Sequence, residues 1–574
     1  MYTTTTISVT QALVSGKECS DILSFMHRNC HLEEIEILGA YTTGASNSSR
    51  LVKKMWSKML QHKSVRSISL HNTNCVPTGA YSSRKQSVAS GTRLVDLRIT
   101  FCNMNMEGIA WLSVNFTHDT CLQKLVLSDN KLCDSSIHAL CGIFETNRTI
   151  TYLDISNNTF GHQGICDICH MLGSDGSTNG LKTLATESNR FRDAGAALLA
   201  QTLQHNTQLC VLNVKNNMVG PGGITSLITM LSQNTTLHTL SLANNCIDGA
   251  AQTLLHSTLQ KYNKTLRSLD VSMLWDDGTV GASSPNVDPA WISRVATVEP
   301  VALLQACRCI HYLRLDGIHT SLRDMHKMAA LLEKNTALRQ ISLVACGLTP
   351  ESIRPLIWGI RGNTTVEQID LSDNNMCGRL DHESKQRVLN AEFWGVLSEN
   401  KSLQVLQLRG NALGTQSMFH GSIFLAQHTT LKILDVSNNE IGSIGALAML
   451  HALAKNTVLR ILDMTQNASF PLSFSRLLSN IVKRRICSQG HASLHVHGIA
   501  LSVTLLEMRC FAQTRLHPGV KITKFDILDS WTKACQARKE AFLLLTCPRL
   551  CSGALRDLSM DALRIILAFN ILPD

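Results

Sequence analysis

The chain has 574 residues, of which 44% are hydrophobic and 17% charged, and its formal net charge is +10. This balance is too apolar for a disordered chain, and no run of about 18 apolar residues predicts a membrane-spanning helix. The N-terminal segment has neither the basic nor the apolar stretch of a secretory signal, so we expect the 20 cysteines to be reduced, mostly buried thiols in the cytoplasm.

Residues 1–64 are expected to form an N-terminal cap that includes one degenerate repeat. Apolar side chains recur there with strand-like spacing at Leu32, Ile35 and Ile37. The same spacing returns more strongly downstream, which marks these residues as a weak first copy of a longer pattern.

Residues 65–470 carry that pattern about 14 times. The stretch Leu122, Leu125, Leu127, Asn130 and Leu132 follows the scheme LxxLxLxxNxL. Most successive copies start 28 or 29 residues apart, at Val65, Leu94, Leu122, Ile150, Leu181, Leu209, Leu237, Leu266, Ile310, Leu338, Val366, Leu403, Leu431 and Leu459. A fixed period of this length predicts a repeat solenoid.

Each repeat is predicted to contain one short strand and one helix. The LxL core alternates as a strand does, and apolar residues such as Ile224, Leu227 and Leu231 then follow at helical spacing. We expect the asparagine at the ninth position, as in Asn130, to bond the backbone of neighbouring turns and form a buried ladder. A second asparagine near each helix end, such as Asn456, suggests a left-handed residue that terminates the helix.

Two insertions interrupt the period, at residues 275–306 and 377–395. The first contains a loop-like stretch at 275–289, and residues 377–387 are also expected to loop out. Leu274 and Ile318 replace the ladder asparagine beside the first insertion, which predicts a bend or soft joint there.

Residues 471–574 lose the repeat and are expected to form a basic, mainly helical C-terminal cap or accessory region. Helices are predicted at 473–485, 525–545 and 555–569. From residue 470 onward there are 14 basic and 7 acidic residues, so +7 of the net +10 lies in this region. The rest of the chain is nearly neutral, which argues against a nucleic-acid surface along its whole length.

The repeat resembles the leucine-rich repeat family, specifically its ribonuclease-inhibitor-like subfamily. This resemblance implies an α/β solenoid, a right-handed βα horseshoe whose concave side is lined by strands. It also implies a cytoplasmic protein that catalyses nothing and binds a protein partner of unknown identity, with cytoskeletal or nuclear association left open. We expect no small-molecule substrate, nucleic acid or membrane partner.

Two other functions remain open from the sequence. The repeat type is similar to that of the Ran GTPase activator, although the basic C-terminal region departs from the acidic tail of that family. Residues 555–569 are similar to the first helix of an F-box, which implies a ubiquitin-ligase substrate receptor. Ser559 stands where that motif has proline, and the chain is too short for the remaining F-box helices.

No catalytic, cofactor or metal site is predicted. Cys166, Cys169 and His170 match the haem-attachment string CxxCH, but they fall on a predicted repeat helix where cysteine packs as a small apolar residue. Other cysteine pairs lack the second pair that a zinc site needs.

The partner-binding prediction rests on strand alternation, which identifies the side chains of the concave face. Aspartate follows the central apolar residue in five repeats, forming an acidic stripe that either meets a basic partner or reflects the repeat consensus. Aromatic side chains are few on this face. The predicted partner-binding residues are Tyr152, Asp154, Asp270, Tyr312, Asp370, Asp435 and Asp463.

Overall fold

The computed structural model describes most of the repeat region and little of either terminus. The described residues are 6–10, 13–14, 31–39, 41–42, 48–74, 93–173, 180–273, 299–374, 376, 383–467, 477, 481 and 495–497. They divide after Leu266 into two compact units, which are treated separately below. This division lies next to the degenerate repeats that precede and follow the first insertion.

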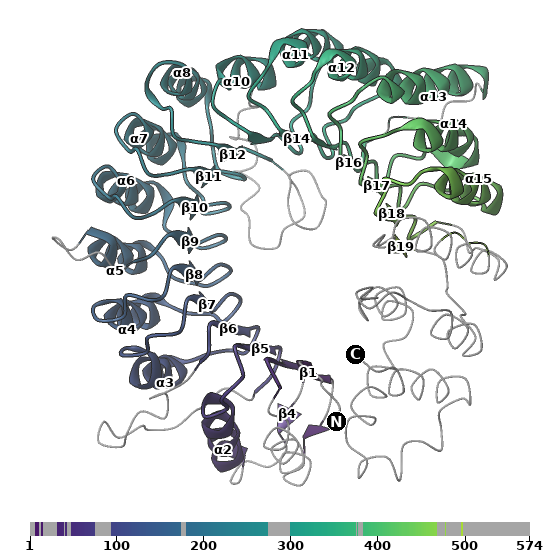
Figure 1. Cartoon of the computed structure of the whole chain (residues 1–574). Coiled ribbons are helices and arrows are strands. Elements are labelled where there is room, and N and C mark those ends of the chain that lie inside the picture. The colour runs from purple at the N-terminus through teal and green to yellow at the C-terminus, as the bar shows by residue number, and fades with distance from the viewer. Residues whose placement is uncertain are drawn as a thin grey trace, which may run out of the picture. The chain divides into compact units, whose positions relative to one another are not determined.

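In unit 1, a parallel sheet has one layer of helices on one side (Figure 1). Each strand pairs in parallel with the strand of the next repeat, in the register Leu125 to Leu153 to Leu184. The strands are β1 (Thr6–Thr10), β3 (Glu34–Leu38), β5 (Ser67–His71), β6 (Asp96–Thr100), β7 (Lys124–Val126), β8 (Tyr152–Asp154), β9 (Thr183–Ala185), β10 (Val211–Asn213) and β11 (Thr239–Ser241). A separate pair joins β2 (Leu13–Val14) to β4 (Tyr41–Thr42).

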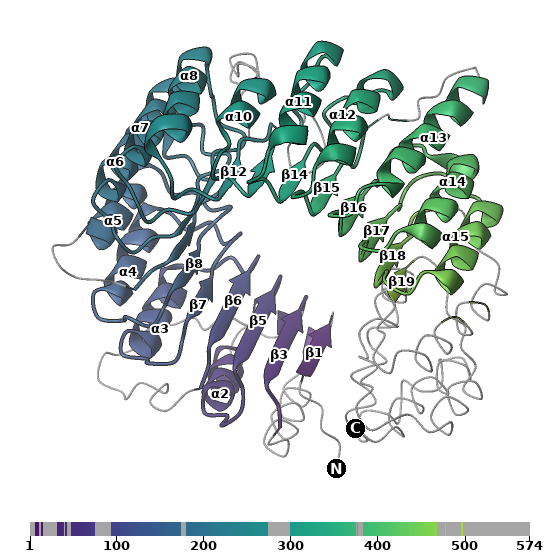
Figure 2. The same ribbon diagram turned by 45° about the horizontal axis from the view of Figure 1, so that its top comes forward.

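Strand β1 lies beyond the first repeat that the sequence predicts. It pairs with β3 over five residues, from Thr6 with Glu34 to Thr10 with Leu38. In Figure 2, β1, β3, β5 and β6 lie side by side as one continuous set of strands. The sheet therefore extends one strand beyond the degenerate first repeat that we expected at Leu32, Ile35 and Ile37.

The helices of unit 1 follow the strands in alternation. They are α2 (Ser48–Leu60), α3 (Met106–Phe116), α4 (Asp134–Phe144), α5 (His162–Gly173), α6 (Arg192–Leu203), α7 (Pro221–Leu231) and α8 (Gly249–Ser257), which continues as the π-helical turn η1 (Thr258–Tyr262).

Unit 2 repeats the same parallel strand–helix order. Its strands are β12 (Ser268–Asp270), β13 (Tyr312–Arg314), β14 (Gln340–Ser342), β15 (Gln368–Asp370), β16 (Val405–Gln407), β17 (Ile433–Asp435), β18 (Ile461–Asp463) and β19 (His495–His497). Its helices are α10 (Pro300–Ala306), α11 (Leu322–Lys334), α12 (Pro350–Gly362), α13 (Glu383–Ser398), α14 (Gly414–Gln427) and α15 (Ser443–Lys455). The predicted α/β leucine-rich-repeat solenoid is thus confirmed as a fold class.

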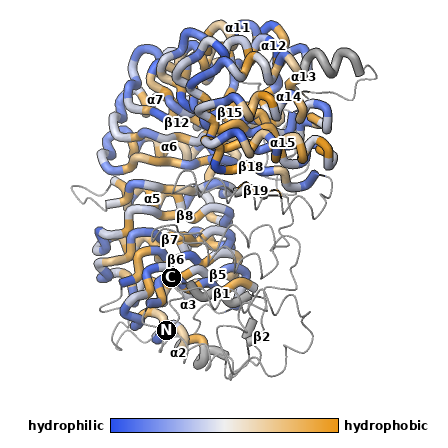
Figure 3. The backbone as a smooth tube through the Cα atoms, turned by 45° about the vertical axis from the view of Figure 1, so that its right-hand side comes forward, coloured by the Kyte–Doolittle hydropathy of each residue, from blue (hydrophilic) through white to orange (hydrophobic). Residues whose placement is uncertain are grey.

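Hydrophobic and hydrophilic stretches alternate along the backbone (Figure 3), and the core of each unit lies between the strands and the helices. The central strand residues Leu153, Leu212 and Leu434 are at most 1% exposed, and helix residues such as Leu227 and Leu450 are fully buried. Fully burying a leucine stabilises a fold by about 1.5–3 kcal/mol, so the repeated apolar positions supply the main driving force.

The predicted asparagine ladder is confirmed. Asn130 Nδ2 donates to the carbonyls of Ile99, Leu127 and Ser128, while its Oδ1 accepts from the backbone N–H groups of Cys102 and Met104. The amide therefore joins its own turn to the preceding repeat.

Two ladder residues depart from full satisfaction. Among the described asparagines of this ladder, Asn189 and Asn411 have a buried Oδ1 without a partner. Each of these two asparagines belongs to the repeat that follows one longer than the usual period. The extra residues displace the turn of the longer repeat whose backbone N–H groups would otherwise donate to this Oδ1.

The second set of asparagines corrects a prediction. Asn335, Asn363 and Asn456 end their helices with φ between −79° and −75°, in extended rather than left-handed backbone. Their side chains explain why, because Asn456 Nδ2 donates to the carbonyls of Leu425 and His428, and its Oδ1 accepts from Val458 and Leu459 N–H. The amide bonds, and not a left-handed turn, redirect the chain into the next strand.

The second insertion is accommodated by a helix. We expected residues 377–387 to loop out, but residues from Glu383 onward belong to the 16-residue helix α13. The loop predicted at 275–289 and the helices predicted at 525–545 and 555–569 lie outside the described residues. So does most of 473–485, of which Leu477 and Ile481 are helical and Ile481 is 2% exposed.

Candidate functional site

Strand alternation places all seven predicted partner-binding residues on the sheet face away from the helices. Tyr152 and Asp154 lie on either side of buried Leu153 and are both partly exposed. The same alternation holds for Asp270, Tyr312, Asp370, Asp435 and Asp463. Tyr152 and Asp154 lie in unit 1 and the other five in unit 2.

The five aspartates share a structural role that the sequence did not reveal. In each case Oδ1 accepts a hydrogen bond from the backbone N–H two residues later. The Ser437 N–H donates to Asp435 at 2.8 Å, and the Thr465 N–H donates to Asp463 at 2.9 Å. This closes the turn after the strand, a typical use of aspartate and asparagine. Asn213 does the same for Lys215 in another repeat, so the turn needs the side-chain oxygen and not the negative charge.

The two predicted tyrosines are partly buried anchors. Lys124 Nζ lies 4.6 Å from the centre of the Tyr152 ring, a cation–π contact between neighbouring strands. Burial raises the pKa of both Tyr152 and Tyr312, so both phenols stay protonated near neutral pH.

An exposed aromatic residue lies near Tyr152 in strand order. Phe101 follows β6 at φ 56° and is 53% exposed, with its ring 5.0 Å from that of His71. Arg98 on β6 pairs with Asp96 at 2.8 Å. Aromatic and arginine side chains of this kind dominate many protein interfaces.

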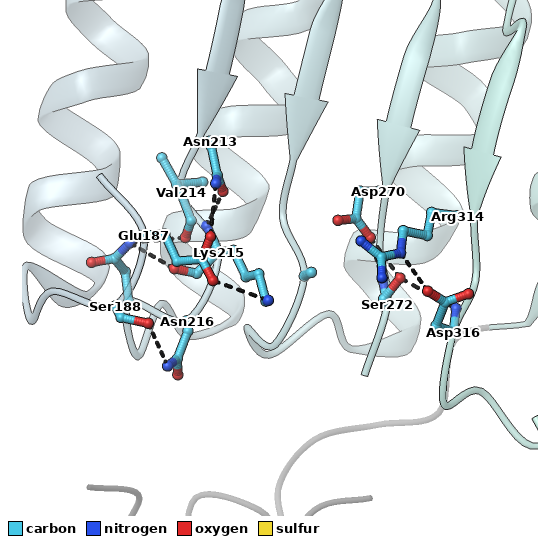
Figure 4. Close-up of polar contacts among 12 residues, drawn as sticks. Glu187, Ser188, Asn213, Val214, Lys215, Asn216, Asp270, Ser272, Arg314 and Asp316 are labelled. Atoms are coloured by element: carbon cyan, nitrogen blue, oxygen red, sulfur yellow. Dashed lines mark hydrogen bonds and ion pairs between the residues drawn. The ribbon is translucent and has the colours of Figure 1, made fainter. Parts of the chain in front are cut away.

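A polar cluster at the ends of β9 and β10 was missed by the sequence analysis. Glu187 pairs with Lys215 at 3.0 Å and accepts from Asn213 Nδ2 at 2.9 Å, while Asn216 Nδ2 donates to Ser188 Oγ (Figure 4). The parallel register brings together residues that are 26–28 positions apart in the sequence. No local sequence motif indicates this pairing.

A second missed cluster occupies the start of unit 2. Asp316 is fully buried, pairs with Arg314 and donates its backbone N–H to Ser272 Oγ (Figure 4). It also accepts a hydrogen bond from Ser342 Oγ at 2.5 Å. Ile318 stands at the ladder position of this repeat, so Asp316 supplies the interrepeat bonds, including one from Val344 N–H at 3.0 Å. The sequence could have indicated this cluster, because an aspartate stands two residues before the position where the ladder asparagine is missing.

The described side chains do not assemble a metal site. Within the described ranges, no group of three or more histidine, cysteine or acidic side chains could hold a metal ion. Cys169 of the CxxCH string is buried in α5, and burial raises the pKa of its thiol to about 11. Of the described cysteines, Cys133 is exposed and several are only partly buried, so burial is less general than we expected.

Comparison with known proteins agrees with the repeat that the structure shows. A leucine-rich repeat family model matches residues 146–169, 233–250 and 427–450. Each matched segment contains a helix end or helix start of the periodic strand–helix array described above. The chain is a leucine-rich repeat protein.

Several relatives carry the repeat as part of larger proteins. Over 402 residues, this leucine-rich repeat chain is 25% identical to mouse NACHT, LRR and PYD domains-containing protein 12, covering 66% of the chain and 37% of that protein. Mouse NACHT, LRR and PYD domains-containing protein 14 is 25% identical over 315 residues, covering 52% of the chain and 31% of that protein. Chicken leucine-rich repeat-containing protein 45 is 32% identical over 95 residues, 16% of the chain and 13% of the relative.

The chain therefore spans well under half the length of these relatives. None of the helices in the described ranges combines the length and apolarity needed to span a bilayer.

Proposed function

We propose that this leucine-rich repeat protein is a non-catalytic, cytoplasmic scaffold of the ribonuclease-inhibitor-like type that binds a protein partner on the sheet face of its repeats. The proposal rests mainly on how the strand positions are used. Buried leucines and ladder asparagines recur because the fold requires them, whereas the partly exposed positions differ from repeat to repeat. A rigid array with variable side chains is suited to recognising a protein surface.

The array offers enough area for such a partner. Strands spaced about 4.8 Å apart place several repeats within the width of a typical interface of about 800 Å² per partner. Tyr152, held by Lys124 on one side, is the best aromatic anchor on the unit 1 face, and Asp154 on the same strand provides a charge beside it.

No observation on the described residues favours the two alternatives. The F-box-like segment at 555–569 lies outside them, and no relative named above is a GTPase activator by its printed name.

The experiment is affinity purification of the tagged chain from its own cytosol, with Tyr152→Ala and Tyr262→Ala as matched variants. Tyr262 is 63% exposed and lies on η1, on the helix side of unit 1. We expect a near-stoichiometric protein that is depleted about tenfold or more by Tyr152→Ala and retained by Tyr262→Ala. Equal recovery with both variants would contradict binding on the sheet face around Tyr152.

A further inference from the structure

The sheet face of β15–β18 in unit 2 carries two parallel rows of side chains. Backbone register aligns Gln368, Val405, Ile433 and Ile461 in one row. It aligns Asp370, Gln407, Asp435 and Asp463 in the next, two residues further along each strand. We call this surface the β15–β18 face.

The carboxylates of the second row are oriented but not neutralised. Asp370, Asp435 and Asp463 each use Oδ1 to accept a backbone N–H, which fixes the carboxylate plane without cancelling its charge. Among the ion pairs between described residues, none includes any of these three. Burial raises the pKa of Asp370, and the negative charges of Asp316 and Asp435 raise it further, so like charges repel on this face.

The first row is apolar on β16–β18 although it lies on the surface, and only its β15 member, Gln368, is polar. Val405, Ile433 and Ile461 are only partly buried, while the leucines that follow them point into the core and are fully buried. An apolar strip beside an acidic strip matches a ligand that has apolar and basic side chains on adjacent faces.

We propose that the β15–β18 face binds an amphipathic helix of a partner protein, with lysine or arginine side chains beside an apolar stripe. This inference rests on the proposed scaffold function and names the partner chemistry for one part of the sheet face. Strands repeat about every 4.8 Å, close to the 5.4 Å rise of one helical turn. A helix crossing the strands presents basic residues at i, i+3 or i+4, and i+10 or i+11 to Asp463, Asp435 and Asp370.

Unit 1 does not offer the same surface. At the equivalent of the aspartate position it carries Arg98, Val126, Asp154, Ala185, Asn213 and Ser241. A single carboxylate in six consecutive repeats makes no acidic row, so the chemistry is specific to unit 2.

The test uses the full chain and a labelled 18-residue leucine–lysine helix with the spacing given above. Its controls are the same peptide with glutamate for lysine and a scrambled peptide of identical composition. The first protein variant is the triple Asp370→Asn, Asp435→Asn, Asp463→Asn. The second is a charge-matched triple on or directly after helices, Glu145→Gln, Glu333→Gln, Glu351→Gln. Asparagine keeps the turn closed, as Asn213 shows, so the first triple removes charge and preserves the fold.

We expect saturable binding of the leucine–lysine helix that weakens about tenfold or more in the aspartate triple and is unchanged in the helix triple. Binding should also weaken in Ile433→Thr and fall with rising salt. Absence of binding to the full chain, equal binding of the glutamate or scrambled peptide, or equal binding to the aspartate triple would each overturn the inference. A purified partner that is lost with Tyr152→Ala but retained by the aspartate triple would overturn it and leave the scaffold function standing.

Discussion

At the scale of single residues, the side chain that follows a helix forms hydrogen bonds that link the helix end to the next strand. His428 forms only some of these bonds. Asn456 both donates to two carbonyls of the preceding repeat and accepts two N–H groups. His428 accepts from Thr430 and Leu431 through Nδ1, but its buried Nε2 has no partner among the described residues. Burial, and then the charge of Lys401, lower the pKa of His428 to about 4.

Replacing His428 with asparagine should stabilise the protein and weaken its acid sensitivity. Restoring the two donor bonds is worth about 1–2 kcal/mol at neutral pH. Because the folded-state pKa is below the unfolded value of about 6.5, the unfolded chain binds more protons as the pH falls, and wild-type stability is lost between about pH 6.5 and 4. Urea unfolding of wild type and His428→Asn at pH 7.5 and 5 measures both effects.

His451→Asn, an exposed change on the neighbouring helix α15, is the control and should match wild type at both pH values. If His428→Asn loses as much stability as wild type between the two pH values, the buried imidazole is not a source of the acid sensitivity.

At the scale of elements, glycine sets how closely neighbouring helices pack. A Cβ on Gly359 of α12 would lie 2.5 Å from the Ala329 carbonyl oxygen and 2.7 Å from Ala329 Cα, both in the backbone of α11. A Cβ on Gly395 of α13 would meet nothing within 4 Å. The two glycines have similar sequence surroundings but opposite structural demands.

Alanine should therefore have opposite effects at these two positions. Gly359→Ala forces α11 and α12 apart and should lower the free energy of unfolding by about 1–3 kcal/mol. Gly395→Ala meets no obstacle and should raise it by about 0.5–1 kcal/mol, since alanine is the better helix former. Thermal unfolding of the two variants beside wild type distinguishes them, and a Gly359→Ala protein as stable as wild type would mean that the helices are not in close contact there.

The sequence predicts the elements whose sequence pattern recurs in every repeat. The repeat period and the alternation of apolar residues are enough to predict the strands, the helices and the ladder formed by residues such as Asn130. Each repeat has the same residue types at the same positions. They do not predict that Asp316, Arg314 and Ser342 form one cluster, since that depends on the register of two strands joined across a degenerate repeat. They also place Asp435 on the sheet face without revealing its bond to Ser437, because that bond depends on the turn geometry after the strand.

At the scale of the whole molecule, contacts run mainly between consecutive elements, such as α6 with α7 and α14 with α15. In a molecule of this kind we expect a destabilising substitution to have a local effect, because each repeat packs only against its neighbours. Asn217 is a sensitive point in unit 1, because its fully buried Nδ2 donates to the carbonyls of Thr186, Val214 and Lys215.

Asn217→Ala should increase hydrogen exchange in β9–β11 and leave β15–β18 unchanged. Unsatisfied backbone groups cost about 1–3 kcal/mol, which corresponds to roughly tenfold to a hundredfold faster exchange where opening is local. Hydrogen-exchange mass spectrometry resolves the two regions, with Thr229→Ala on the exposed side of α7 as the control. A uniform increase in both units would show that they unfold as one cooperative body.

The interrepeat bonds also bear on how such a gene changes over generations. The bond from Asn217 N–H to Asn245 Oδ1 spans 28 positions, as does the one from Asn411 N–H to Asn439 Oδ1. Duplication or loss of one complete period recreates the same donor and acceptor at the new junction, whereas a shift of a few residues misaligns them, as beside Asn189. Unequal recombination can therefore lengthen or shorten this protein in whole modules, and each event changes the set of variable face positions while the framework stays intact.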